Sequence, residues 1–592
     1  MLLIGASARG ADPVTYDVTF TPSGDAELDS LLKQSASLVS LRAKLPPAPF
    51  ALIGRAKADE TLFLTVLHSL GYDDGSVDIT IDGQALDSPA LLTALTAMPA
   101  SQHAQVQVVP HKGLLFHVGN VIISGLPQGF TPPAMVKTGD VARAQPILAA
   151  SPALRAALQN DGYAFATVDA PLAVANLQTH TLNVTYTVQP GPRVDVGQIE
   201  FSGLKRTDAS FLRRHIRLKP GQLYSAKNVS AARDSLLSLG VFSSVTGAPQ
   251  PAQGNTAPVM FRVIEQKRHA VTLGGAYATD TGINISTSWE DRNVFRRAET
   301  LTLTATANGL GGTGTTAPGY DLKAAFAKPD YDTPGQTLTL TAEGLKQSLT
   351  AYDRDGILLS GTLARPITRH TAITYGPAFS SMNVKQEGIS HTYVLVQFPI
   401  GFTFNNTNSL LEPTRGVNVS LGITPTVPVA GSSSVFVILQ GSVATYVPVE
   451  RNGRGVIAMR LMAGSIQGAG NFSVPPDQRF YAGGSGTVRG YTYQTIGPLF
   501  PDGTPEGGAA MDAVNLEFRQ HVWGNIGVVP FADAGQVSSS STPFTGTMRV
   551  GVGLGLRYYT GIGPIRMDVA FPLSHIPGSN SFALYLGLGE AF

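Results

Sequence analysis

The stretch RVGVGLGLRYY, residues 549–559, alternates between apolar side chains and small or charged ones. The apolar residues all have even numbers: Val550, Val552, Leu554 and Leu556. Between them stand Arg549, Gly551, Gly553, Gly555 and Arg557. Because successive side chains of a β-strand point to opposite faces, this pattern predicts a strand with one apolar face. The glycines also resemble a dinucleotide-binding loop, but no helical pattern follows them, which argues against that interpretation.

The same period of two recurs from residue 268 to residue 592. It is clear in ETLTLTATA (299–307), GQTLTLTAEG (335–344) and SFALYLGLG (581–589). We count about sixteen such segments, or about twenty residues for each strand and its connection, as in outer-membrane barrels. A soluble sandwich would need several domains, and no linker composition separates them. Residues 268–592 are therefore predicted to form an all-β, 16-stranded antiparallel transmembrane barrel.

The overall composition narrows the function classes. Charged residues make up 14% of the chain, against about 25% in a typical soluble domain, and the net charge of +1 does not favour nucleic acid as a partner. There is no cysteine, and the eleven histidines form no closely spaced pair. No run of 18 apolar residues is present, which excludes a transmembrane helix. We predict no metal, no cofactor and no catalytic residue, with a surface esterase barrel as the enzyme alternative.

Residues 14–267 have a mixed α/β pattern that repeats. Three segments begin with a strand pattern that ends in glycine, and each helical stretch after it ends at a second glycine: Gly24 and Gly71, Gly125 and Gly162, Gly203 and Gly240. In the second and third segments the two glycines are 37 residues apart and the segments repeat at 78, whereas the first spacing is 47. Landmarks that agree in spacing indicate a structural repeat. The predicted unit is strand–helix–helix–strand–strand, at 14–110, 111–191 and 192–267.

Residues 1–13 precede these repeats. Their sequence, MLLIGASARGADP, has a short apolar run followed by Ala6-Ser7-Ala8, which resembles the small-x-small cleavage site of a secretory signal. The positively charged start of such a signal is missing. The segment is therefore interpreted either as a signal-peptide remnant or as an ordinary flexible terminus.

Three motifs of the second half provide candidates for a site: VRGY (488–491), LEFR (516–519) and FADAG (531–535). The guanidinium of arginine presents a planar fork of donors that suits carboxylates. Alternation places Asp533 on the same face as its motif partners, and Gly490 lets backbones approach closely. VRGY alone favours a solvent-exposed loop arginine, which would contribute little to stability. The candidate residues are Val488, Arg489, Gly490, Tyr491, Glu517, Phe531, Asp533 and Gly535.

The repeats resemble POTRA domains, the polypeptide-transport-associated modules, and the third segment, with GQIEFSG (197–203), fits best. POTRA repeats followed by a barrel that carries VRGY and FADAG resemble the superfamily of outer-membrane protein assembly and two-partner secretion. This resemblance covers nearly the whole chain. It implies that the sixth extracellular loop folds back into the lumen, where Arg489 meets Asp533, with Glu517 as the second carboxylate.

Within that superfamily, three repeats and sixteen strands resemble the TamA family, the outer-membrane subunits of the translocation and assembly module. The alternatives are BamA-like insertases, which usually have five repeats, and two-partner-secretion transporters, which have two. The resemblance implies a bacterial outer-membrane location with the repeats in the periplasm. It also implies that the protein assembles or translocates outer-membrane proteins, autotransporters especially. The expected partners are an inner-membrane-anchored TamB-like protein at the N-terminal repeat, unfolded clients and lipid.

Closing a barrel requires its first strand, near AVTLGGAYAT (270–279), to pair with its last, near SFALYLGLGEAF (581–592). A short or strained seam leaves main-chain groups that can pair with an incoming strand. Gly587 and Gly589 are expected to weaken the last strand, and Phe592 is its terminal aromatic residue. Glu590 shares the phase of the apolar residues around it, so the strand must end, kink or reach the membrane interface there.

Overall fold

The computed structural model describes residues 14–99, 101–279, 281–432, 434–450, 453–561, 563–576 and 581–592. The predicted signal remnant or flexible terminus, residues 1–13, lies outside these ranges. The chain forms two compact units, one of residues 1–200, 218–232 and 247–261 and one of 201–217, 233–246 and 262–592. Among the described residues, no helix is both long and apolar enough to cross a bilayer.

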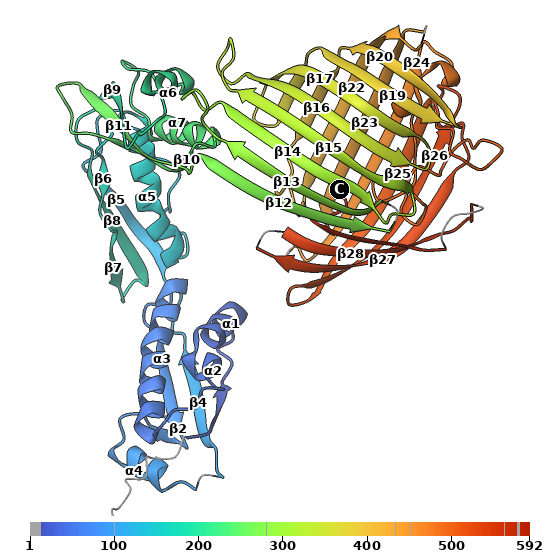
Figure 1. Ribbon diagram of the computed structural model, residues 1–592. Helices are drawn as coiled ribbons and strands as arrows, with labels where there is room; N and C mark the ends of the chain where they lie inside the picture. Colours follow the sequence, from blue (N-terminus) through green and yellow to red (C-terminus); the bar gives the residue numbers. More distant parts are fainter. Residues whose placement is uncertain are drawn as a thin grey trace, which may run out of the picture. The chain divides into compact units, whose positions relative to one another are not determined.

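The first segment of the N-terminal half is a sheet covered by helices (Figure 1). Its elements are β1 (Tyr16–Phe20), α1 (Ala26–Ser35), α2 (Ser37–Ser40), α3 (Pro49–Leu70), β2 (Ser76–Ile81), β3 (Gln84–Ala85), α4 (Pro89–Ala97) and β4 (Ala104–His111). One face of α3, with Leu52, Phe63 and Leu67, is buried in the same core as Val77 and Val106 of the sheet. Gly71 ends α3 in the left-handed conformation, as the sequence predicts.

The second and third segments follow the same plan. The second contains β5 (His117–Ser124), α5 (Ala144–Asn160), β6 (Thr167–Val168), β7 (Leu172–Asn176) and β8 (Thr181–Gln189). The third contains β9 (Asp195–Ser202), α6 (Ala209–His215), α7 (Ala226–Ser238), β10 (Phe242–Pro249) and β11 (Thr256–Glu265). In each sheet the first strand pairs with the last, and an intervening strand pairs with the last strand on its other side: β1-β4-β2, β5-β8-β7 and β9-β11-β10.

The glycine that ends the first strand has a physical reason in two of the repeats. A Cβ atom on Gly125 would lie 2.1 Å from the carbonyl oxygen of Val188, and one on Gly203 would lie 2.2 Å from that of Val263. Both glycines also have positive φ, which other residues rarely adopt. The recurring glycine therefore marks where the chain leaves the first strand in contact with the last.

One predicted helix is absent from the second segment. Residues 125–143 are all described and contain no α-helix, so this segment has only α5 between its first strand and the strands that follow. Pro127, Pro132 and Pro133 lie in this stretch. Because proline lacks the N–H group and clashes with the preceding turn, the two-helix expectation was wrong here.

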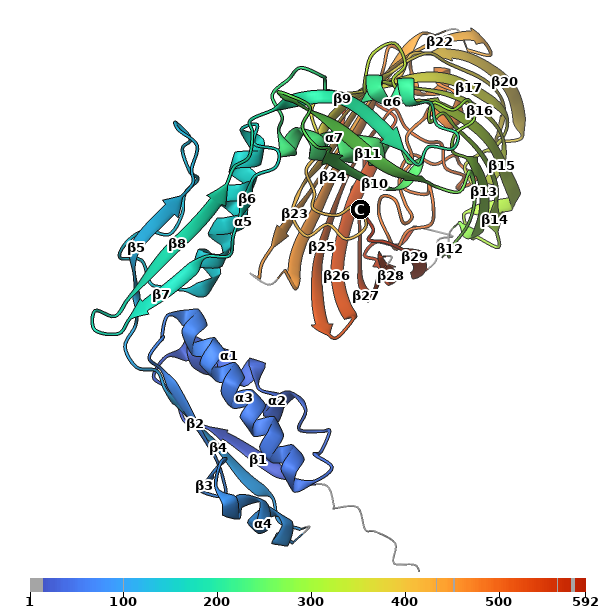
Figure 2. The ribbon, with the colours of Figure 1, turned by 90° about the vertical axis from the view of Figure 1, so that its left-hand side faces the viewer.

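The C-terminal half is a closed antiparallel wall (Figures 1 and 2). Its segments are β12 (His269–Ala278), β13 (Gly282–Asp291), β14 (Thr300–Leu310), β15 (Thr315–Lys328), β16 (Thr337–Leu349), β17 (Asp353–Pro366), β18 (Thr371–Tyr375), β19 (Ala378–Gln386), β20 (Ile389–Gln397), β21 (Ile400–Asn405), β22 (Gly416–Ala430), β23 (Phe436–Pro448), β24 (Gly455–Gln467), β25 (Ala510–Trp523), β26 (Ile526–Ser538), β27 (Arg549–Thr560), β28 (Gly563–Pro572) and β29 (Ala583–Leu588). Among the described residues, β18 with β19 and β20 with β21 are two interrupted strands, which confirms the predicted sixteen-stranded barrel.

The two interruptions lie side by side in the wall. Pro377 separates β18 from β19, Pro399 separates β20 from β21, and Pro425 occupies the neighbouring position in β22. Main-chain bonds link the three sites, from the Gly376 N–H to the carbonyl of Pro399 (3.3 Å) and from the Phe398 N–H to that of Pro425 (3.0 Å). Because proline has no N–H group, this row of the wall has fewer hydrogen bonds than its surroundings.

Candidate functional site

The long connection between β24 and β25, residues 468–509, returns into the barrel. It contains the short 3₁₀ turns η1 (Asn471–Ser473) and η2 (Pro476–Gln478) and carries the VRGY tetrad. Val488 and Tyr491 are fully buried in a small apolar cluster with Ile496, Val537 and Ile576. The Tyr491 hydroxyl donates to the carbonyl of Val550 (3.1 Å). The tip of the loop is therefore fixed to the inner face of the wall on both sides of Arg489.

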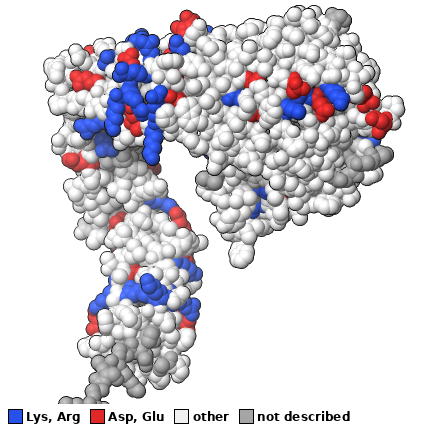
Figure 3. Space-filling model, viewed as in Figure 1, with Lys and Arg blue, Asp and Glu red and all other residues white. Residues whose placement is uncertain are grey.

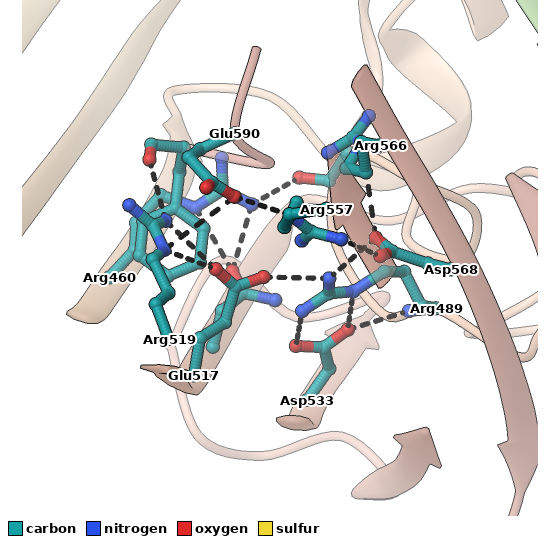
Figure 4. Close-up of polar contacts among 12 residues, drawn as sticks. Arg460, Arg489, Glu517, Arg519, Asp533, Arg557, Arg566, Asp568 and Glu590 are labelled. Carbon is teal, nitrogen blue, oxygen red and sulfur yellow. Dashed lines mark hydrogen bonds and ion pairs between the residues drawn. The ribbon is translucent and has the colours of Figure 1, made fainter. Parts of the chain in front are cut away.

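Arg489 is bound to Asp533 of β26 in the bidentate manner (Figure 4). Its Nε donates to Oδ2 (2.7 Å) and its Nη2 to Oδ1 (2.9 Å). The main-chain N–H of Arg489 donates to the same carboxylate (3.1 Å). Three hydrogen bonds from one residue fix both the side chain and the backbone of the loop.

Two further carboxylates reach the same guanidinium. Arg489 Nη1 donates to Oε1 of Glu517 on β25 (2.7 Å) and to Oδ2 of Asp568 on β28 (3.1 Å). Arg489 is 2% exposed, and all three acids are fully buried. Its Cζ lies 3.5 Å from the ring centroid of Phe531, a distance typical of a cation–π contact. Burial lowers the pKa of Arg489, but the hydrogen bond to Asp533 and the charges of Glu517, Asp533 and Asp568 raise it more, so the net shift is upward.

Glycines on the wall make room for the loop. A Cβ atom on Gly551 would lie 1.9 Å from the carbonyl oxygen of Arg489, and one on Gly535 would lie 2.8 Å from Cγ2 of Val488. Within the loop, Gly490 has φ +96°, and a Cβ there would lie 2.8 Å from the main chain of Phe571. The glycines that alternate with apolar residues in β27 thus form part of the surface against which the loop lies.

The seam between β12 and β29 is short. Only Tyr277–Leu586 and Ala278–Tyr585 are register pairs among the described residues, whereas β12 and β13 share ten. Thr279 adds hydrogen bonds of 3.0 and 2.8 Å to the carbonyl of Leu584. Residues 269–276 of β12 therefore have a strand partner on one side only.

The end of the chain leaves the wall after β29. Gly589 has φ +87°, and Glu590 turns inward to accept a hydrogen bond from Arg557 Nε (2.7 Å). The ring of Phe592 lies under Arg460 and Arg519, with 4.9 and 5.2 Å from its centroid to their Cζ atoms. The last residues are therefore held in the lumen and do not extend the seam.

Comparison with known proteins agrees with this architecture. The model of the Omp85 superfamily domain matches residues 293–592, more than half of the chain. The chain belongs to the Omp85 superfamily. The model of the surface antigen variable number repeat, a POTRA repeat, matches residues 117–191 and 194–266. As predicted, the Omp85 barrel lies in the outer membrane and the POTRA repeats lie in the periplasm.

The chain is similar in sequence to several proteins that are named as assembly factors or as components of an assembly machinery. It is 23% identical over 559 residues to the outer membrane protein assembly factor BamA of Neisseria meningitidis, covering 82% of this chain and 68% of that protein. It is 26% identical over 342 residues to the sorting and assembly machinery component 50 homolog B of Xenopus laevis, covering 52% and 66%. The chain spans 53% of a third relative, BamA of Nitratidesulfovibrio vulgaris. BamA of Haemophilus ducreyi lacking POTRA domains 1–3 has the same fold, with a TM-score of 0.65 at 20% identity, covering 80% of this chain and all of that one.

Two narrower predictions are the TamA family and a third POTRA repeat at residues 14–110. The relatives above are named BamA or component 50, so TamA remains a prediction. The first segment, 14–110, lies outside the POTRA matches, but its sheet has the strand order of the two matched repeats. Among the described residues, no group of three or more histidines, aspartates and glutamates is placed to hold a metal ion.

The structure brings together the eight residues chosen from VRGY, LEFR and FADAG. The seam residues are more dispersed in this Omp85 barrel: Gly587 lies in β29, Gly589 lies at the bend, and Phe592 lies inside the lumen. A Cβ on Gly587 would have no neighbour closer than 3.5 Å, so nothing around it requires glycine.

Sequence reasoning did not select Asp568, although alternation in GPIRMDVAFPL indicates it. In β28 the exposed apolar residues Ile565 and Met567 have odd numbers, so Asp568 must face the lumen. There it also accepts from Arg557, which links the Arg489 cluster to Glu590 and the end of the chain.

Proposed function

We propose that this protein inserts β-barrel proteins into the outer membrane by pairing their strands with the free edge of β12. The observation that carries the proposal is the seam, where two register pairs hold β12 to β29 and eight residues of β12 have no strand partner on that side within the part of the chain that the structure describes. The names of the BamA relatives support the same class of activity. The mechanism breaks and forms hydrogen bonds and no covalent bond.

The physical reason is the membrane itself. Unpaired main-chain N–H and C=O groups are costly in hydrocarbon, so an open strand edge there strongly favours an added strand. Addition of an extended segment to a sheet edge uses main-chain hydrogen bonds and accepts many sequences. The short seam thus offers an incoming strand an edge to pair with, and few hydrogen bonds must break to open it.

The Arg489 cluster has a complementary role in this proposal. It joins the inner loop to β25, β26 and β28, three of the four strands that lead up to β29 in the wall. These strands share long, regular registers, with ten pairs between β26 and β27. The cluster therefore stabilises the C-terminal side of the barrel while its last strand exchanges partners.

A disulfide across the seam tests the proposal, because the chain contains no native cysteine. Tyr277→Cys with Leu586→Cys places two cysteines at a register pair. Insertion of a client barrel into liposomes should fall to the rate without the protein when the pair is oxidised and should recover after reduction. The matched control is Leu516→Cys with Ala532→Cys, a register pair between β25 and β26 that remains closed in the proposed cycle. Full activity of the oxidised seam variant would contradict strand exchange at this site.

We further propose, on the resemblance to TamA, that residues 14–110 bind an inner-membrane-anchored TamB-like protein and that autotransporters are among the clients. A large membrane-anchored protein should then co-purify with the full chain and be lost when residues 14–110 are deleted. Retention of that protein by the truncated chain would contradict docking on the first repeat, without bearing on the seam.

A further inference from the structure

A pocket of about 690 Å³ lies outside the lumen, where the wall meets its periplasmic turns. It is lined by α6, by the turns that follow β13 and β15, and by the ends of β17 and β18. All of its lining residues belong to the second compact unit. Because β12 starts directly after the last periplasmic repeat, the ends of β13, β15 and β17 are the periplasmic ends of their strands.

The pocket contains cations without acidic partners. Arg214, Lys328 and Arg365 line it, and among the described residues none of the three forms an ion pair within 4.0 Å. Arg214 donates only to the hydroxyl of Ser210 (3.3 Å), and Lys328 lies 5.6 Å from the ring centroid of Tyr331. Arg214 also interacts electrostatically with Asp208 and Asp330, so the charges that remain available to an anion are those of Lys328 and Arg365.

Two acids of the pocket are already satisfied within the protein. Asp330 is hydrogen-bonded to His215 (2.6 Å) and accepts from the Gly335 N–H (2.7 Å). Glu299 accepts from the main-chain N–H of Arg297 (2.9 Å). Asp332 is exposed at the edge. Arg297, the fourth cation of the pocket, has its own acidic partner in Asp208 (3.8 Å) and therefore adds no free charge.

The cations lie at the lower border of the lipid-facing wall. Arg365 has the parity of Ile357 and Leu359 in β17, whose side chains are exposed on the outer face, and Lys328 has the parity of Leu322 in β15. Leu363 and Tyr375, a register pair that also lines the pocket, continue this apolar face. An apolar wall that ends in aromatic and cationic side chains is typical of a membrane interface.

We propose that this pocket binds the headgroup phosphate of an anionic phospholipid in the periplasmic leaflet, with its acyl chains against the wall above Arg365 and Lys328. Figure 3 shows lysines and arginines gathered over the third repeat, whereas most of the visible barrel surface is uncharged. The short turns at the opposite rim, 279–281, 311–314, 350–352 and 387–388, contain no lysine or arginine. An acidic peptide would satisfy the cations but not the adjoining apolar wall, so lipid fits both halves of the site.

Binding of a fluorescent short-chain phosphatidylglycerol to the full chain in micelles tests the proposal. Arg365→Gln and Lys328→Gln should each weaken binding about fivefold, as expected for one basic contact at a membrane surface. Arg369→Gln, an exposed arginine four residues from Arg365 that does not line the pocket, should leave binding unchanged. Phosphatidylcholine with the same chains should bind more weakly than phosphatidylglycerol, and inorganic phosphate should not displace the bound lipid at equal concentration.

Three outcomes would overturn the lipid site: an equal loss in Arg369→Gln, equal binding of phosphatidylcholine, or displacement by inorganic phosphate or by an acidic peptide at equal concentration. Each variant should retain the heat-modifiable gel migration of the wild-type barrel, which separates loss of the site from loss of the fold. Client insertion in the seam experiment is a separate measurement, so failure of either proposal leaves the other intact.

Discussion

Arg489 provides one guanidinium to three buried carboxylates from three different strands. One arginine does not neutralise three carboxylates. Arg519 forms an ion pair with Glu517, and Arg557 forms one with Asp568, so three arginines balance the three acids. Buried charges are stable only when each has its partner, since removal of one leaves the other desolvated. Position 489 is therefore where a single substitution should affect the loop most.

Arg489→Ala should destabilise the folded loop by about 3–5 kcal/mol. The reason is that Asp533 loses both hydrogen bonds that it accepts from the guanidinium and stays buried. The barrel should still form, since its wall hydrogen bonds are unchanged. Arg489→Lys should restore only part of the loss, because an ammonium group does not reproduce the planar fork. Urea unfolding in micelles and proteolysis within 468–509 measure the two effects, and a loop as resistant as wild type in Arg489→Ala would contradict the role of the cluster.

Gly551→Ala tests the same contact without changing any charge. Its Cβ would lie 1.9 Å from the carbonyl oxygen of Arg489, so the loop or β27 must move. We expect a loss of about 1–3 kcal/mol, as for an overpacked core, together with increased cleavage of the loop. Gly587→Ala is the matched control, because its Cβ would make only ordinary contacts with the side chain of Arg566 (3.5 Å or more), and it should change stability by no more than about 0.5 kcal/mol. Equal effects of the two alanines would show that close packing at position 551 is unimportant.

At the residue scale, the sequence identified Arg489, Asp533 and Glu517 because short motifs and alternation agree on them. The sequence did not predict that Phe592 lies in the lumen. The alternating pattern continues to the last residue, whereas in the structure the strand ends before Gly589. Gly589 was noted as a weakening residue, but only the positive φ in the structure shows the direction of the bend.

At the scale of elements, the closest ion pair of the inward segment after β29 joins Glu590 to Arg557 (2.7 Å), and Arg519 lies farther from the same carboxylate (3.8 Å). Glu590→Gln should release residues 589–592 from the lumen, because Arg557 loses this carboxylate but keeps Asp568. A Phe592→Cys reporter in the otherwise cysteine-free chain should then react faster with a maleimide. Glu412→Gln is the matched control, since Glu412 is half-exposed and pairs only with His521 (3.1 Å). Unchanged reactivity after Glu590→Gln would show that the hydrogen bond from Arg519 Nη2 to the main-chain oxygen of residue 592 (3.0 Å) suffices to hold the segment.

Local patterns predicted most elements but not their interruptions. Strands such as 299–307 and 335–344 follow directly from alternation, which depends only on the geometry of neighbouring residues. The breaks at Pro377 and Pro399 could have been expected from the proline rule, yet their alignment across strands depends on register, which the sequence does not state. The helix expected in 125–143 is missing for a related reason, because the repeat pattern that predicts it takes no account of the prolines of this stretch.

At the scale of the whole molecule, the barrel should persist in detergent as a hydrogen-bonded cylinder. The chain should fractionate with the outer membrane and migrate faster on a gel before heating than after, because all but one of its strand junctions carry long registers. Recovery of the full chain in the soluble fraction without detergent would contradict the membrane assignment.

Fold class and location could be predicted from the sequence, because both depend on patterns repeated over hundreds of residues. The subfamily could not, since it depends on the number of periplasmic repeats and on partners that leave no local pattern. The first segment illustrates the difficulty: its landmark spacing of 47 residues differs from the other two, although its sheet has the same order.

The position of Pro377, Pro399 and Pro425 in the barrel has a mechanical consequence. Counted from β12, these prolines lie on the seventh, eighth and ninth of sixteen strands, which is half-way round the cylinder from the junction with β29. A gap that widens on one side of a closed ring must be absorbed by bending on the other, and bending concentrates where the cross-links are fewest. If the β12–β29 junction widens as proposed, we therefore expect the wall to bend at these three prolines, whereas the Arg489 cluster should keep the strands between the prolines and the junction together.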